Sequence, residues 1–154
     1  KNPAVKNNSK NDAYFRMYVR IPVASVVTAD RSGRVLNGGM AVETDLFTYT
    51  ENAGTGMRKI SDYYEGGVAS DSNAGRKYHV YEYAYTGGGW TEIPLPAGQD
   101  IPALFNQVAF ANVIEGQVDG NLEFIKVDLR RFSLADLHLR RRPGLLMEDR
   151  IHNS

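Results

Sequence analysis

The sequence predicts a mainly β fold (β-rich α+β), in which antiparallel hairpins form a sandwich or a partly open barrel with one or two short helices. Long stretches of the 154-residue chain alternate apolar and polar residues, which is the period of a strand with one buried face. Clusters of Gly, Asp, Asn and Ser, which favour turns, separate those stretches. Because 42% of the residues are hydrophobic, the chain can bury one core, and we expect a single main domain.

The first hairpin is expected near the N-terminus. One face of its first strand is wholly apolar and consists of Phe15, Met17, Val19, Ile21 and Val23. The turn residues Asp30 to Gly33 follow, and residues 40–50 alternate again. A loop at this turn would place Val23 opposite Met40 and Arg20 opposite Glu43, so that apolar matching and charge pairing agree.

Two further hairpins are expected around glycine turns. The run Gly87-Gly88-Gly89 would pair Tyr83 with Ile93. Asp119-Gly120 is a preferred two-residue turn and would pair Phe110 with Leu129, after a short helical turn at 101–106.

Two other segments carry helical signals. Met57, Ile60, Tyr63 and Tyr64 are spaced as on one face of a helix. Ser133 to Asp136 has the pattern of a helix start, ahead of Leu137 and Leu139. We therefore expect a short helix at each place.

The ends of the chain differ from its middle. Residues 1–12 are polar and Asn-rich and predict a flexible arm, residues 13–139 the β domain, and residues 140–154 a basic tail. The zero net charge is divided into blocks. Residues 1–42 carry seven basic and two acidic side chains (+5), residues 43–125 four and twelve (−8), and residues 126–154 seven and four (+3). Such blocks favour attraction between segments or between subunits.

The composition excludes several classes of protein. No apolar run approaches the roughly 20 residues of a membrane-spanning helix. A chain without cysteine has no disulfide, thiolate nucleophile or cysteine-based metal site, although this leaves the compartment open. A start at Lys1 is compatible with a processed chain or an excised fragment. His79, His138 and His152 form no metal-ligand spacing, so no metal and no cofactor is expected.

No catalytic residue is predicted, and the chain is expected not to be an enzyme. Glu43 and Asp45 share one strand face, but Arg20 and Tyr18 are expected opposite them, which is typical of a solvated sheet face. The sequence Gly54-Thr55-Gly56 could begin an anion-binding helix, yet it completes no phosphate-loop motif.

The candidate binding residues are aromatic or basic. Tyr81, Tyr83, Tyr85 and Trp90 cluster around a strand that also carries His79, and such a cluster either packs a sheet or binds bases, sugars or a protein. The basic run of Arg140, Arg141 and Arg142 could contact phosphates or an acidic partner.

Three functions are compatible with these features. The leading hypothesis is a non-enzymatic binding or assembly module that pairs with copies of itself or with a protein partner through edge strands, arm and tail. The second is a β domain that binds single-stranded nucleic acid through Arg16, Tyr18, Arg20 or the tyrosines. The third is a small-ligand or enzyme barrel with a pocket at His79, Tyr81 and Glu92.

Overall fold

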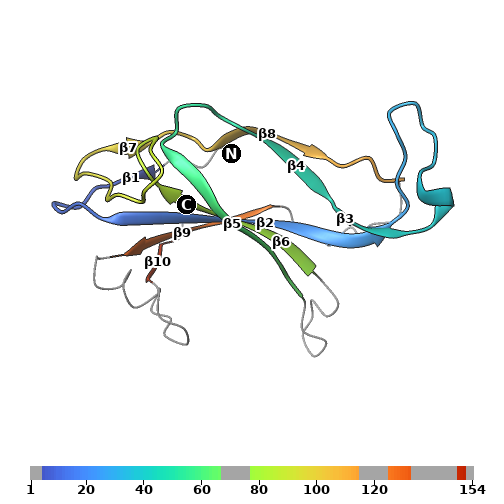
Figure 1. The fold of residues 1–154 in the computed structure, drawn as a ribbon, viewed down its shortest axis with the longest axis horizontal. Helices are drawn as coiled ribbons and strands as arrows, with labels where there is room; N and C mark the ends of the chain where they lie inside the picture. Colours follow the sequence, from blue (N-terminus) through green and yellow to red (C-terminus); the bar gives the residue numbers. More distant parts are fainter. Residues whose placement is uncertain (1–4, 67–76, 115–124, 133–148, 152–154) are drawn as a thin grey trace.

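The computed structural model describes residues 5–66, 77–114, 125–132 and 149–151, which form two packed layers of antiparallel strands (Figure 1). The lower layer is a six-stranded sheet in the order β10 (Asp149–Ile151), β9 (Lys126–Phe132), β2 (Tyr14–Val26), β6 (Lys77–Tyr85) and β5 (Met57–Glu65), with β3 (Val42–Asp45) also paired to β2. The upper layer contains β4 (Phe47–Glu51) paired with β8 (Phe105–Phe110), and β1 (Val5–Lys6) paired with β7 (Asp100–Ile101). The predicted β-rich sandwich or open barrel is confirmed.

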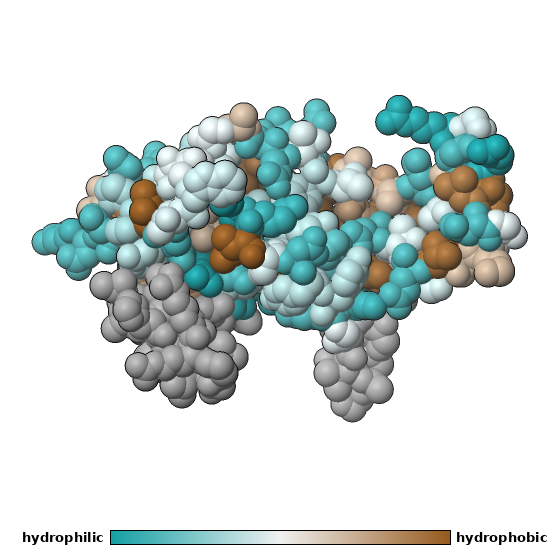
Figure 2. All heavy atoms as spheres, in the orientation of Figure 1, coloured by the Kyte–Doolittle hydropathy of each residue, from teal (hydrophilic) through white to brown (hydrophobic). Residues whose placement is uncertain are grey.

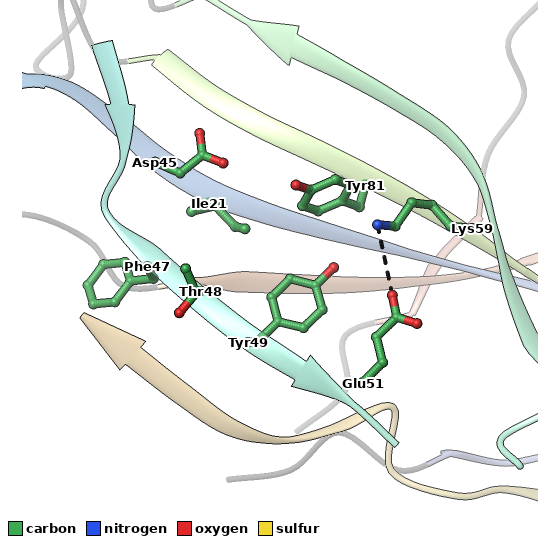
Figure 3. A pocket seen from close by; sticks show the side chains of 8 residues that line it. All are labelled: Ile21, Asp45, Phe47, Thr48, Tyr49, Glu51, Lys59 and Tyr81. Atoms are coloured by element: carbon green, nitrogen blue, oxygen red, sulfur yellow. Dashed lines mark ion pairs between the residues drawn. The ribbon is translucent and has the colours of Figure 1, made fainter. Parts of the chain in front are cut away.

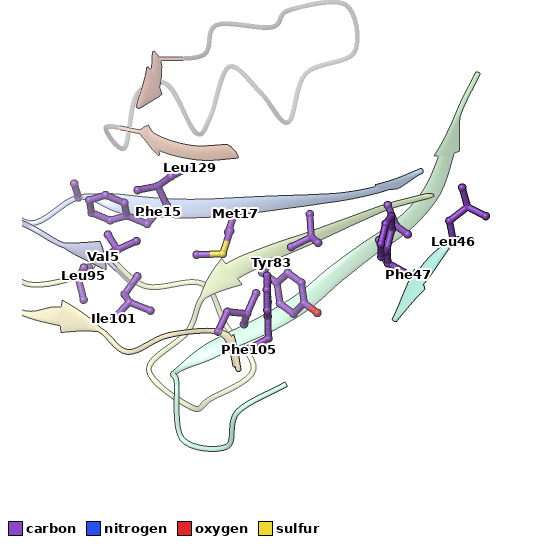
Figure 4. Packing of buried hydrophobic residues seen from close by; sticks show 14 of the residues in the cluster. Val5, Phe15, Met17, Leu46, Phe47, Tyr83, Leu95, Ile101, Phe105 and Leu129 are labelled. Carbon is purple, nitrogen blue, oxygen red and sulfur yellow. The ribbon is translucent and has the colours of Figure 1, made fainter. Parts of the chain in front are cut away.

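The core lies between the two layers. The five alternating residues of β2, from Phe15 to Val23, are all buried, as the sequence predicts. Four of them, from Phe15 to Ile21, pack in one cluster with residues of the upper layer such as Phe47, Leu95 and Phe105 (Figure 4). Burying a large apolar side chain contributes about 1.5–3 kcal/mol, so this face provides much of the stabilisation.

Leu46 marks the corner where the chain passes from one layer to the other. Its backbone N–H donates to the carbonyl of Pro22 at 2.9 Å, and its carbonyl accepts from the N–H of Ala111 at 2.8 Å. Its side chain is fully buried. Strand β3 therefore continues into β4 while it exchanges β2 for β8 as its neighbour.

The predicted helix at Met57 is wrong, because this segment is strand β5. Its register shifts between Lys59 and Ser61, which breaks the two-residue alternation and produces spacings that resemble those of a helix. Among the described residues the only helical element is a 3-10 turn at Asn37–Gly39. The predicted helical turn at 101–106 is also wrong, since β7 ends at Ile101 and β8 begins at Phe105.

The first hairpin exists with a different register. Val23 lies opposite Asp45 rather than Met40, because residues 27–41 form a longer loop than the turn at Asp30 implied. The predicted pairing of Arg20 with Glu43 is therefore wrong. Arg20 binds Glu65 and Asp128 instead.

The other two predicted hairpin pairings are wrong as well. Tyr83 lies opposite Met17 and Lys59, because β6 is enclosed by β2 and β5. Leu129 lies opposite Met17 and Ile151, because β9 is enclosed by β2 and β10. The turn at Asp119-Gly120 and the helix at Ser133 lie outside the described residues.

The described parts of the two ends both join sheets. Val5 of the expected arm is buried, and the side-chain amide of Asn7 donates to the carbonyls of Leu95 and Asn11, at 3.0 Å each. In the expected tail, β10 pairs with β9. None of the described helical segments has the length and apolar character needed to cross a bilayer.

Candidate functional site

The central strand β6 divides its residues between two faces of the large sheet. His79, Tyr81 and Tyr83 face the upper layer, with Tyr83 in the core. Glu82 points to the opposite, outer face, where it meets Arg16 and Tyr18. Strand alternation thus creates two separate clusters, one on each face.

The inner cluster is a column in which the ring of His79 lies between those of Tyr64 and Tyr81, with a lysine beside each tyrosine. The His79 ring lies 4.4 Å from the Tyr64 ring at an interplanar angle of 19°, and 4.3 Å from the Tyr81 ring. Lys59 Nζ lies 4.0 Å from the centroid of Tyr81, and Lys77 Nζ lies 5.0 Å from that of Tyr64. Cation–π attraction favours this alternation.

Carboxylates accompany every cation of the column. Lys77 binds Glu43 at 2.8 Å, and Lys59 lies 3.9 Å from Glu51. His79 is held at both nitrogens: Nδ1 lies 2.6 Å from Asp45, and Nε2 contacts Asp62. Glu43 and Asp45 are therefore bound by Lys77 and His79 rather than by the predicted Arg20 and Tyr18.

The contacts of His79 indicate that it is an imidazolium. A neutral imidazole has a single N–H and could donate to one carboxylate, whereas the imidazolium donates to both. Burial alone would lower the pKa of His79, but the hydrogen bonds and charges of Asp45 and Asp62 outweigh it, so the pKa is raised.

A chain of hydroxyl groups lies beside this column. The hydroxyls of Tyr49 and Tyr83 are 2.6 Å apart, and that of Tyr83 donates to Glu51. Since the Tyr83 proton goes to Glu51, Tyr49 is the donor to Tyr83. Burial raises the pKa of both tyrosines well above its usual range, and the bond to Glu51 raises that of Tyr83 further. Both phenols therefore stay neutral.

A cleft of about 220 Å³ opens between β4 and β6 (Figure 3). We call it the β4–β6 cleft; its lining residues are Ile21, Asp45, Phe47, Thr48, Tyr49, Glu51, Lys59 and Tyr81. In Figure 3 the polar ends of Lys59 and Glu51 point toward each other and the hydroxyls of Tyr49 and Tyr81 point into the space between the strands. The cleft thus combines two apolar side chains, Ile21 and Phe47, with several convergent polar groups, and convergent polar groups fix the orientation of a ligand.

The predicted site residues do not form one surface. His79 and Tyr81 lie together, but Tyr83 is 1% exposed and offers no ring face to a ligand. Tyr85 is half-buried. Trp90 is 84% exposed, with the guanidinium of Arg58 3.9 Å from its ring. Arg140, Arg141 and Arg142 lie outside the described residues.

Glu92 is separated from the pocket that was expected to contain it. It binds Arg16 through two hydrogen bonds, at 2.8 and 3.1 Å, as part of the outer cluster. In that cluster Glu82 accepts hydrogen bonds from Arg16, Tyr18 and Ser61. Burial alone would raise the pKa of Glu82, but these hydrogen bonds and the charge of Arg16 lower it.

No pattern in the sequence indicated the other half of the inner cluster. Tyr49, Glu51, Lys59, Asp62 and Tyr64 come from β4 and β5, whose positions depend on pairings that the sequence mispredicted. A correct assignment of β5 as a strand with a bulge would have placed Asp62 near His79.

Apart from the two clusters and the cleft, the structure has a free edge at β8. Within the described residues β8 pairs with β4 alone. After the buried Phe105, residues 106–110 are all exposed, and residues 101–114 contain no charged side chain. Edge strands of this kind are open to pairing with another chain.

Comparison with known proteins adds no assignment. No protein-family model matches the chain, and no curated protein or solved structure matches it significantly. Among the described residues no three metal-ligating side chains are grouped to hold an ion. The functional argument therefore rests on the inner cluster, the β4–β6 cleft and the edge of β8.

Proposed function

We propose that this protein is an assembly module that pairs the free edge of β8 with the same edge of a second copy. The observation that carries the proposal is an exposed, uncharged strand whose outer edge has no ladder partner among the described residues. Backbone N–H and C=O groups at such an edge form hydrogen bonds with any extended chain that aligns with it.

A comparison with β5, an edge strand of the large sheet, supports the choice of β8. Strand β5 ends the lower sheet, and its charged residues are Arg58, Lys59, Asp62 and Glu65. Charges and a bulge are the usual features by which proteins protect an edge from pairing. Strand β8 has neither a charge nor a break after residue 107.

The side chains of β8 also favour an added strand. Val108 lies opposite Tyr49 and Phe110 opposite Phe47, so both point to the inner side of the ribbon. They are nevertheless 48% and 51% exposed. A strand added at this edge would cover part of both side chains. The face of the molecule in Figure 2 is largely hydrophilic and carries only separate hydrophobic patches, so an extended apolar surface is not what would bring two copies together there.

A second copy fits this edge because the two edges are identical. Antiparallel pairing about a two-fold axis places each strand opposite itself, and an uncharged strand meets no like charge there. The association therefore needs no contribution from the opposite charge blocks of the sequence.

The test is the molar mass of the full chain in solution, measured by light scattering and sedimentation over a range of concentrations. We expect a monomer–dimer equilibrium that is the same at low and high salt, because no ion pairs form the contact. Val108→Lys introduces a charge at the edge and is expected to weaken the dimer at least tenfold.

Ile60→Lys is the matched control. Ile60 is 43% exposed on the already charged edge of β5, so this variant is expected to dimerise like the unaltered chain. A monomer at every concentration would overturn the proposal. So would a dimer that survives Val108→Lys unchanged, or one that dissociates in salt, which would indicate the charge blocks instead.

A further inference from the structure

We propose that the β4–β6 cleft binds a short, uncharged oligosaccharide. This function is separate from the β8 edge, because the lining residues come from β2 to β6 and none comes from β8. It assigns the half-buried Tyr81 and its surroundings to a ligand of defined chemistry.

The shape of the cleft favours a narrow, extended ligand. Its lining follows β4 from Phe47 to Glu51, five residues whose first and last Cα atoms lie about 13 Å apart when extended. Its volume of about 220 Å³ is below the roughly 300–1,000 Å³ of pockets that enclose a drug-sized molecule. A long cleft of small volume admits a thin chain of rings lying along β4.

The polar groups of the cleft retain hydrogen-bonding capacity. Within the part of the chain that the structure describes, the hydroxyls of Tyr81 and Thr48 form no hydrogen bond. Toward the other described residues, Asp45 uses only Oδ2, for His79, and Glu51 uses only Oε1, for Tyr83 and Lys59. The cleft thus offers acceptors, from the carboxylates, and donors, from the hydroxyls and the ammonium group of Lys59. Sugar hydroxyls, which both donate and accept, complement such a mixture.

The charges of the cleft are already compensated. Asp45 is paired with the imidazolium of His79, and Glu51 lies beside Lys59. A charged ligand would have to separate one of these pairs, which costs free energy in a partly buried site. A neutral ligand can use the remaining lone pairs while each pair stays intact.

The apolar part of the lining suits the carbon face of a sugar ring. Ile21 and Phe47 are buried at the base of the cleft, and the ring of Tyr49 stands between Phe105 and Tyr81. The ring of Tyr81 is already in contact with His79 and Lys59, so it is not the surface on which a sugar stacks. Its hydroxyl is the part that remains for the ligand.

The experiment is an amide NMR titration of the full chain with maltotriose, cellotriose, xylotriose and triacetylchitotriose. At least one is expected to shift resonances of residues 45–51, 59 and 81 with a millimolar dissociation constant that does not change with salt. Tyr81→Phe removes one hydroxyl and is expected to weaken binding about fivefold, equivalent to ~1 kcal/mol.

Tyr63→Phe is the control, because Tyr63 is a tyrosine of the neighbouring strand β5, is 38% exposed and does not line the cleft. Equal weakening by the two variants would overturn the proposal, as would the absence of shifts at the cleft with every trisaccharide. Shifts with the polyamine spermidine but not with sugars would identify a cation site and also overturn it. The Val108→Lys variant is expected to bind the same trisaccharide unchanged, because Val108 does not line the cleft. Failure of the assembly proposal and failure of the sugar proposal can therefore be told apart.

Discussion

The two faces of the large sheet hold charged clusters of different kinds. On the outer face, Arg16 and Arg20 bind Glu82, Glu92, Glu65 and Asp128, and the two arginine side chains are 12% and 14% exposed. On the inner face the central cation is His79, whose partner Asp62 is 54% exposed. The outer cluster thus depends on cations that stay charged at any ordinary pH, and the inner one on a group that titrates.

The difference teaches that each face is weakened at an opposite extreme of pH. The lowered pKa of Glu82 means that its contribution to stability is present above the ordinary glutamate pKa of about 4.3 and is lost as the pH falls. The raised pKa of His79 places its contribution to stability at low rather than high pH. Its contribution is present below about pH 6.5 and is lost as the pH rises through the folded-state pKa.

The largest effect is expected from Glu82→Gln. Glu82 is 8% exposed and accepts from Arg16, Tyr18 and Ser61, so loss of its charge leaves a buried guanidinium with Glu92 as its remaining carboxylate. We expect the free energy of unfolding to fall by about 3 kcal/mol. Urea denaturation measures it.

Glu65→Gln is the control for this prediction. Glu65 binds Arg20 on the same face but its side chain is 41% exposed, so its loss is expected to cost about 1 kcal/mol or less. If the two variants lose the same stability, burial does not distinguish the pairs of the outer face.

An intermediate effect is expected from the titration of His79. Between about pH 6 and pH 9 the unaltered chain is expected to lose on the order of 1 kcal/mol as the imidazolium loses its proton between Asp45 and Asp62. His79→Gln is expected to remove most of this slope. The difference between the two proteins cancels the titration of His138 and His152.

Urea denaturation at several pH values checks this prediction. A slope of the same size in His79→Gln would contradict it, because some other group would then be responsible. A stability that increases between these pH values would show that His79 is neutral in the folded chain, contrary to the raised pKa.

The smallest effect is expected at the end of the inner column. Lys77 binds Glu43, whose side chain is 62% exposed, and Lys77 is itself 35% exposed. Lys77→Met keeps the length of the side chain and removes the charge, so we expect a loss of about 0.5 kcal/mol. A loss as large as that of Glu82→Gln would show that exposed and buried pairs on this sheet are equivalent.

The sequence predicted strands more reliably than their partners. The apolar positions of β2 have a two-residue period that only an extended chain can bury on one face, and all of them are in the core. Strand β5 was missed because its bulge disturbs that period. The hairpins at Gly87 and Asp119 were predicted from turns, but β6 pairs with β5 and with the distant β2, and β9 pairs with β10 and with the same β2.

The candidate site was predictable in part for the same reason. His79 and Tyr81 alternate on one strand, so their common face follows from sequence alone. Asp45, Asp62 and Glu51 reach them only because β3, β4 and β5 occupy particular places around β2 and β6. No local pattern specifies which carboxylate arrives at which nitrogen of His79.

By itself, the sequence determined that this chain is a β-rich domain with one apolar strand face at its centre and an uncharged stretch at residues 101–114, since composition and alternation are local properties. Only the tertiary structure decided that this stretch ends as an exposed edge, that Tyr83 is buried while Trp90 is exposed, and that His79 lies between two carboxylates. The physical reason is that strand pairing joins residues far apart in the chain, and its register is selected by the packing of the whole core.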